Sequence, residues 1–172
     1  CMSRRHLNWS LGRVLFETAR PAQLLLIFFV YLYGAKVALF TGASLSAQAL
    51  VSGALVLLLT ATSVHQINEY ADYETDARTD RTAFSGGSGA LQRFDVSRTV
   101  TLRSAAITLS LGIVLAVAFA LRGVLSVRAV GVLAVIAVFG WQYSVGPLKL
   151  AWRGWGELDN AVLGGLVLPV YG

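Results

Sequence analysis

The feature that most constrains this chain is a series of apolar segments long enough to cross a lipid bilayer. A helix needs about 20 predominantly apolar residues to span the hydrocarbon core. Four complete spans are expected, at residues 21–40, 45–67, 105–121 and 129–143 with its flanks. A fifth apolar segment begins at residue 156 and continues to residue 172. Pro21 follows Arg20 at the start of the first span, and proline suits the first turn of a helix, where its missing N–H costs nothing.

The composition supports a membrane protein. Hydrophobic residues make up 56% of the chain and charged residues 13%, whereas a soluble domain carries about a quarter charged residues. The net charge is +5, but the basic residues lie between the apolar segments, as topology signals do, so no nucleic-acid partner is expected. The single cysteine, Cys1, excludes an internal disulfide framework. We therefore expect an all-α membrane protein: a multispan transmembrane helical bundle over residues 1–172 as a single domain, with four complete spans plus the start of a fifth.

The distribution of lysine and arginine predicts how the spans are oriented. Eleven basic residues flank one set of span ends and three flank the other. Because basic residues accumulate on the cytoplasmic side, we expect a multi-pass protein of the cell (inner) membrane whose N-terminus and whose loops after the second and fourth spans are cytoplasmic. The eleven are Arg4, Arg5, Arg13, Arg20, Arg78, Arg81, Arg93, Arg98, Arg103, Lys149 and Arg153, and the three are Lys36, Arg122 and Arg128.

A cluster of acidic residues directly follows the second span. Five of the nine acidic residues lie between positions 69 and 80. On a helix, Asn68, Asp72 and Asp76 are four residues apart and share one face, whereas Glu69 and Glu74 are expected to point elsewhere. Two carboxylates and an amide oxygen are hard ligands of the kind that Mg²⁺ prefers when it bridges to phosphate. A solvated acidic helix end is the simpler interpretation for a soluble helix, but acids clustered on a membrane-length helix are costly and usually functional.

Two neighbouring features have both a structural and a functional interpretation. The basic, glycine-rich stretch of residues 81–89 is typical of an ordinary linker, but also of a loop whose N–H groups approach phosphate oxygens. His65 lies one turn before Asn68. We expect it to form a hydrogen bond between packed helices rather than to bind a metal.

Three motifs together resemble the UbiA superfamily of intramembrane prenyltransferases. The spacing Asn68-x-x-x-Asp72-x-x-x-Asp76 resembles its first aspartate-rich motif. Two further matches are Arg20-Pro21 before the first span and Tyr143-Ser144-x-x-Pro147-Leu148-Lys149-Leu150 after the fourth, although Gly146 stands where many members have proline. The glycine-rich loop followed by Leu91-Gln92 looks most like the menaquinone branch, which prenylates 1,4-dihydroxy-2-naphthoate.

The resemblance implies a Mg²⁺-dependent transfer of a prenyl group from an isoprenyl diphosphate to an aromatic acceptor in the lipid bilayer. Negative charge builds on the departing diphosphate, and Mg²⁺ stabilises it. By resemblance, Asn68, Asp72 and Asp76 would hold Mg²⁺ on the diphosphate, and Asp72 and Asp76 would be catalytic.

Four other residues receive substrate roles through the same resemblance. Arg20 and Lys149 would contact phosphate oxygens or the carboxylate of the acceptor. Tyr143 and Ser144 would line the pocket, and the catalytic ring of Tyr143 would favour a cationic intermediate. Each has a structural alternative too: Arg20 and Lys149 serve as topology anchors, and Tyr143 as an aromatic residue of the membrane interface.

The resemblance also implies that the chain is the N-terminal half of an enzyme. Members of the superfamily have further spans and a second aspartate-rich motif. After Asp95 the only acids here are Glu157 and Asp159, which lie two positions apart on different helix faces. We therefore expect the chain to be inactive by itself.

Other functions are compatible with parts of the pattern. A UbiA-type transferase could use another acceptor, such as 4-hydroxybenzoate, chlorophyllide, haem or a glyceryl lipid. A transporter or channel fragment could use Asp72 and Asp76 as a cation site, but such acids are expected at mid-membrane, whereas these continue into a polar loop. A non-catalytic membrane scaffold would leave the acidic stripe unexplained.

The uneven distribution of basic residues generates a test of orientation. With Cys1 replaced by serine, a cysteine introduced at Ser88 should react with a membrane-impermeant reagent only from the cytoplasmic side. A cysteine at Ser126 should react only from the opposite side. Labelling in the reverse sense would contradict the predicted topology.

Overall fold

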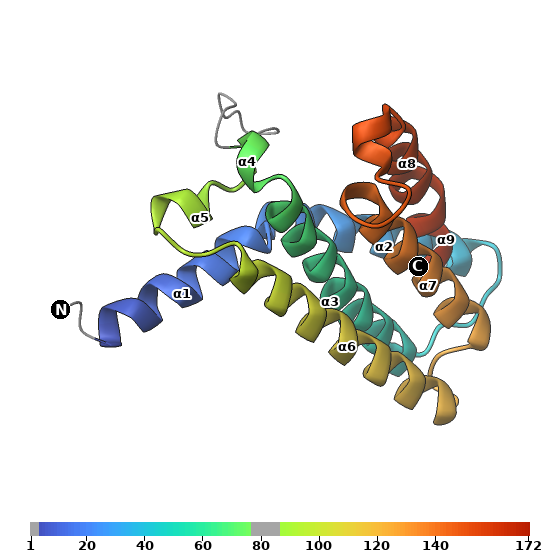
Figure 1. The fold of residues 1–172 in the computed structure, drawn as a ribbon. Coiled ribbons are helices and arrows are strands. Elements are labelled where there is room, and N and C mark those ends of the chain that lie inside the picture. Colours follow the sequence, from blue (N-terminus) through green and yellow to red (C-terminus); the bar gives the residue numbers. More distant parts are fainter. Residues whose placement is uncertain (1–3, 77–86) are drawn as a thin grey trace.

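The computed structural model describes residues 4–76 and 87–172, and every regular element in these two ranges is helical (Figure 1). The expected all-α class is confirmed for this part of the chain. Most of the glycine-rich loop, residues 81–86, lies outside it, together with Arg78 and Asp80. The elements are α1 (Arg4–Thr18), α2 (Pro21–Phe40), α3 (Ala47–Ala71), α4 (Tyr73–Asp76), α5 (Ala90–Arg93), α6 (Thr99–Leu121), α7 (Val127–Ser144), η1 (Leu150–Arg153), α8 (Gly156–Val162), η2 (Leu163–Val167) and α9 (Leu168–Tyr171).

Four helices, α2, α3, α6 and α7, are long and apolar enough to cross a membrane. They contain 20, 25, 23 and 18 residues, and at 1.5 Å per residue they extend about 27 to 38 Å, which matches a hydrocarbon core about 30 Å thick. The four expected spans are therefore confirmed by length and composition. The apolar segment after them folds as the consecutive elements α8, η2 and α9, with a π-helical turn in η2.

Two helices extend beyond the predicted apolar limits. α3 continues to Ala71 instead of stopping at residue 67, and α6 begins at Thr99 instead of residue 105. Hydropathy marks the part of a helix that suits lipid, but backbone hydrogen bonding continues into polar residues that face water. In α3 this extra turn carries the polar residues Asn68 and Glu69.

Short polar turns set where the spans begin. The hydroxyl of Ser46 accepts a hydrogen bond from the Ala49 N–H at 3.0 Å and caps α3. The hydroxyl of Ser126 does the same for α7, from the Ala129 N–H at 3.1 Å. Because a serine at the N-cap satisfies one of the free N–H groups of the first turn, these residues define the reversals opposite the polar end.

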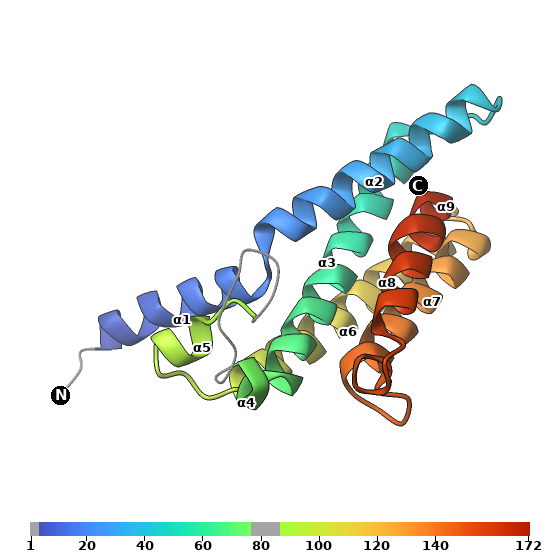
Figure 2. The ribbon, with the colours of Figure 1, turned by 90° about the horizontal axis from the view of Figure 1, so that it is seen from above.

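α3 is the central helix of the bundle. Seen from above, it lies between α2 and α6 (Figure 2), and α7 also packs against it. In its most apolar 18-residue window 44% of residues are buried, against 17% in each of the other three spans. The core cluster contains one or more buried residues from α2, α3, α6, α7, α9 and the α6–α7 connection: Tyr31, Val56, Leu57, Ala116, Leu125, Leu133, Leu168 and Tyr171.

Hydrogen bonds between helices supplement this packing. The Ser63 hydroxyl of α3 donates to the Ala105 carbonyl of α6 at 2.8 Å and accepts from the Trp141 indole of α7 at 3.0 Å. The Tyr171 hydroxyl donates to the Gly53 carbonyl at 3.1 Å. Such bonds are worth about 0.6 to 2 kcal/mol each in a membrane. Through its two hydrogen bonds, Ser63 connects α3 to both α6 and α7.

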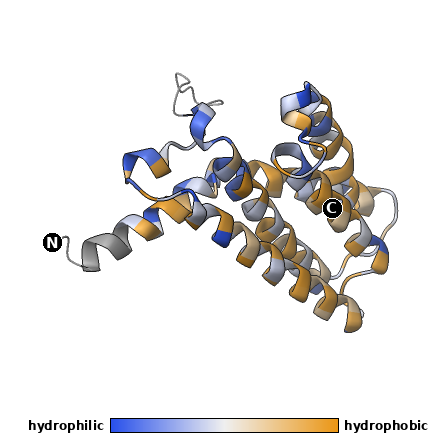
Figure 3. Cartoon of the chain, in the orientation of Figure 1, coloured by the Kyte–Doolittle hydropathy of each residue, from blue (hydrophilic) through white to orange (hydrophobic). Residues whose placement is uncertain are grey.

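The polar residues gather at one end of the bundle (Figure 3). Hydrophilic residues surround α4, α5 and the end of α3, whereas α6 and α7 are hydrophobic along most of their length. α5 packs on α1 through a small cluster of Val14, Ala90 and Leu91. The candidate site lies at this end, where the first residues of α2, the last residues of α3 and α7, and α8 come together.

The contact between α3 and α7 generates a test of packing. A Cβ added at Gly140 would lie 2.6 Å from the Cγ2 of Val64, whereas nothing lies within 4 Å of one added at Gly131 on the same helix. Both changes to alanine raise helix propensity equally. Overpacking should therefore make Gly140→Ala less stable than Gly131→Ala by about 1 to 3 kcal/mol, so that it unfolds at a lower temperature. Thermal unfolding in detergent measures the difference, and equal stability of the two variants would contradict the close packing.

Candidate functional site at the polar end of the bundle

A cavity of about 770 Å³ opens at the polar end, between the α1–α2 corner, the end of α3, α7 and the start of α8. Its wall is mixed: Phe16, Leu26, Val64 and Leu163 supply apolar surface beside the polar groups. Five of the predicted site residues line it, namely Arg20, Asn68, Asp72, Asp76 and Tyr143. Two do not belong to its wall, Ser144 and Lys149.

Asn68, Asp72 and Asp76 keep their predicted common face although α3 ends before Asp72. α3 ends at Ala71, and Asp72 has φ −93° and ψ 5°. The four-residue hydrogen bonding nevertheless continues, because the Asp72 N–H donates to the Asn68 carbonyl at 2.9 Å and the Asp76 N–H to the Asp72 carbonyl at 2.8 Å. The helical spacing is therefore kept into α4, and all three side chains line one cavity.

Ser144 supports the stripe from behind. Its side chain is buried, and its hydroxyl donates to Oδ1 of Asn68 at 2.6 Å. This bond joins the end of α7 to the end of α3 and orients the amide oxygen that was predicted as a ligand. We had expected Ser144 to line the pocket, and it instead positions a residue that does.

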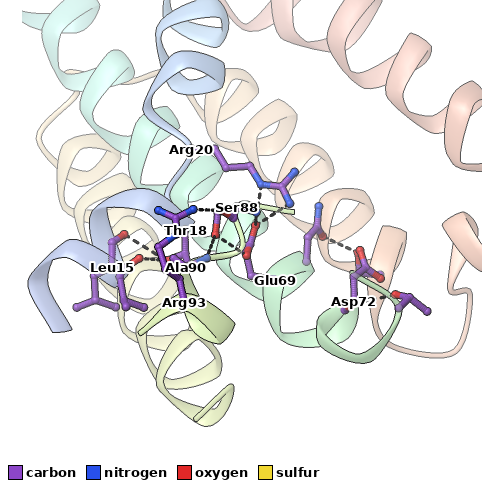
Figure 4. Close-up of polar contacts among 12 residues, drawn as sticks. Leu15, Thr18, Arg20, Glu69, Asp72, Ser88, Ala90 and Arg93 are labelled. Atoms are coloured by element: carbon purple, nitrogen blue, oxygen red, sulfur yellow. Dashed lines mark hydrogen bonds and ion pairs between the residues drawn. The ribbon is translucent and has the colours of Figure 1, made fainter. Parts of the chain in front are cut away.

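Glu69 accepts hydrogen bonds from two different segments (Figure 4). Oε1 accepts from Nε and Nη2 of Arg20, at 3.0 and 2.7 Å, and from the Ser88 N–H at 2.8 Å. Oε2 accepts from the Ser88 hydroxyl at 2.8 Å. The prediction that Glu69 points elsewhere missed this role. A signal was present, since Glu69 is the acid nearest the apolar part of its span, and Arg20 precedes the neighbouring span at the same membrane surface.

Arg20 has an unusual backbone conformation at the corner between α1 and α2. Its φ is 54° and its ψ is 67°, in the left-handed region. The following proline disfavours the right-handed helical region for this residue, and a left-handed non-glycine residue costs of order 1 kcal/mol or more. The ion pair with Glu69 is one interaction that offsets this cost.

Of Tyr143, Lys149 and Asp159, two line the cavity and one does not. Tyr143 lines the cavity from α7, and a Cβ at Gly156 would lie 3.0 Å from its ring, so α8 approaches it closely. Lys149 is exposed before η1, has a left-handed φ of 43° and is not part of the cavity wall. Asp159 of α8 does line the cavity, although the sequence assigned it no role.

The acidic residues on the cavity wall could hold a metal ion only together with oxygen atoms of a ligand. Among the described residues no group of three or more His, Cys, Asp and Glu side chains could hold a metal. Mg²⁺, however, is commonly bound by one or two carboxylates together with phosphate oxygens and water. Asp72, Asp76 and the Asn68 amide supply that smaller donor set on the cavity wall. Gly87 is close enough that a Cβ there would overlap the Asp76 carboxylate, so glycine allows the backbone to approach the acid.

Burial raises the pKa of the Asp72 carboxyl from its ordinary value of 3.8 to about 6. Repulsion from the Asp76 carboxylate also raises this pKa, and repulsion from Glu69 raises it further, whereas the positive charge of Arg20 lowers it. A neighbouring positive charge such as a metal ion would favour the ionised form of this carboxyl.

Comparison of the chain with family models, with curated protein sequences and with solved structures found no match.

The raised pKa generates a titration experiment. Asp72 should lose its proton near pH 6, and because its pKa is above that of the unfolded chain, its contribution to stability is present below about pH 4 and is lost as the pH rises through about 6. Asp76→Asn should lower the Asp72 pKa while leaving it above 3.8, since burial is the larger cause. Infrared difference spectra of the carboxyl band, with Asp72→Asn to identify it, measure this. Titration of the wild-type band near 4 would contradict the burial of Asp72.

Proposed function

We propose that this protein is a UbiA-type intramembrane prenyltransferase. It would transfer a prenyl group from an isoprenyl diphosphate to an aromatic acceptor, with 1,4-dihydroxy-2-naphthoate as the acceptor that the sequence resemblance favours. The observation that carries the proposal is the convergence of Asn68, Asp72, Asp76 and Arg20 on one cavity at the polar end of four apolar helices. The distribution of basic residues supports a cytoplasmic position for this end in the inner membrane.

The cavity suits a substrate that has an anionic head and an apolar body. Oxygen donors and the Arg20 guanidinium lie on its wall beside Phe16 and Leu26. When bound by Asn68, Asp72 and Asp76, Mg²⁺ would neutralise charge on the departing diphosphate. Arg20 would contact the anionic head, and the Tyr143 ring would stabilise positive charge at the allylic carbon.

A transporter with an acidic cation site is the second candidate. Its expected feature is a carboxylate near the middle of the membrane. Asp72 instead follows the last residue of α3, and Asp76 ends α4 in the polar region. This location favours a site that opens toward the polar end, as prenyl transfer requires.

Substitution of the acids tests the proposal. In the full gene product, Asp72→Asn and Asp76→Asn should each lower Mg²⁺-dependent prenyl transfer by about a hundredfold or more, since each removes a charge that holds the metal on the leaving group. Glu74→Gln is the matched control, because Glu74 lies on the same short helix and its side chain is 70% exposed. Transfer of radiolabelled geranylgeranyl groups to 1,4-dihydroxy-2-naphthoate is the measurement. Full activity in both aspartate variants would refute the assignment.

A further inference from the structure

Glu69 is a buried carboxylate to which the proposed chemistry gives no direct part. Its side chain is 4% exposed. Each of its oxygens is nevertheless satisfied, by two donors of Arg20 and two donors of Ser88. Arg20 belongs to the α1–α2 corner and Ser88 to the turn before α5. One carboxylate therefore fixes two segments that both line the cavity.

The hydrogen bonds determine which edge of Arg20 remains available. Nε and Nη2 both donate to Oε1 of Glu69. Nη1 has no hydrogen-bond partner among the described residues. A guanidinium has five N–H donors in a rigid fork, so occupation of the Nε side leaves the end formed by Nη1 and the second hydrogen of Nη2. That end can bind two oxygens of one phosphate or carboxylate in parallel.

The second segment places the backbone near the acids. Oε1 of Glu69 lies 3.5 Å from the position of a Cβ at Gly87, and that same Cβ would overlap Asp76. The bonds from Ser88 to Glu69 thus hold the Gly87 backbone against a candidate metal ligand. Arg93 extends the connection to α1, because its Nη2 donates to the Ser88 carbonyl at 3.4 Å and its Nη1 donates to Oε2 of Glu17 at 2.9 Å.

We propose that Glu69 is a positioning residue, which holds the Nε edge of Arg20 and the Ser88 turn so that the free end of the guanidinium is offered to an anionic ligand group. This inference rests on the proposed function, because it specifies how that site orients a diphosphate or a carboxylate. A carboxylate is suited to the role since it accepts from all four donors, whereas the NH₂ group of a glutamine cannot accept a hydrogen bond.

Substitution of Glu69 should separate turnover from anion binding. In the full gene product, Glu69→Gln removes a negative charge beside the cavity, so the affinity for inorganic pyrophosphate with Mg²⁺ should hold or rise. The orientation of Arg20 is lost, and kcat for prenyl transfer should fall by about ten- to a hundredfold. In an Arg20→Gln background the same change should lower kcat little further, because Glu69 acts through Arg20.

Two control variants separate positioning from general damage to the fold. Ser63→Ala removes two hydrogen bonds between spans, remote from the cavity wall, and should lower thermal stability with kcat retained. Glu74→Gln removes one exposed acidic charge and should leave kcat unchanged. If Glu69→Gln does not fold, Glu69→Asp keeps the charge but shortens the side chain, and should show the same loss of kcat with pyrophosphate binding retained.

The outcomes distinguish this inference from the function on which it rests. A wild-type full gene product that neither binds pyrophosphate nor transfers prenyl groups would refute both. Wild-type kcat in the folded Glu69 variants, or losses from Glu69→Gln and Arg20→Gln that add fully, would overturn the positioning role alone.

Discussion

The polar end of this protein depends on charges that are removed from water and must therefore be paired. A buried carboxylate without a partner is expensive, and Glu69 at the end of α3 is 4% exposed. Its contacts with Arg20 and Ser88 make burial tolerable and at the same time fasten the α1–α2 corner and the turn before α5 to the central helix. Removing one partner of such a pair leaves the other charge buried and unpaired, which lowers the stability of the fold more than replacing both partners does.

α3 both forms the packed centre of the bundle and carries site residues at its polar end. Along the apolar part it is the most buried span, with Ser63 joining it to α6 and α7. At its end it presents Asn68, followed by Asp72 and Asp76, to a cavity. Because the apolar part is held by packing on several sides, the polar end is placed on a rigid support, and a site on a rigid element is more precise than one on a loop.

The helical backbone determines the spacing of Asn68, Asp72 and Asp76 but not the orientation of their side chains. Backbone hydrogen bonds keep Asp72 and Asp76 in register with Asn68, whereas side-chain orientation comes from neighbours. The Ser144 hydroxyl holds the Asn68 amide, and Gly87 lies against the Asp76 carboxylate. The raised pKa of Asp72 follows from the same crowding, since desolvation and a second acid both disfavour its charged form.

Features that depend on nearby residues were predictable from the sequence. Four apolar spans follow from local apolar length, and the shared face of Asn68, Asp72 and Asp76 follows from the helical repeat, which relates residues four apart. The contacts between distant segments became known only from the folded structure. Arg20 and Glu69 are 49 positions apart, and Ser144 and Asn68 are 76 apart. Lys149 matched a motif but lies away from the cavity, and Asp159 matched none but lines it. Which side chains meet depends on how helices pack, and hydropathy and spacing along a single helix do not encode that geometry.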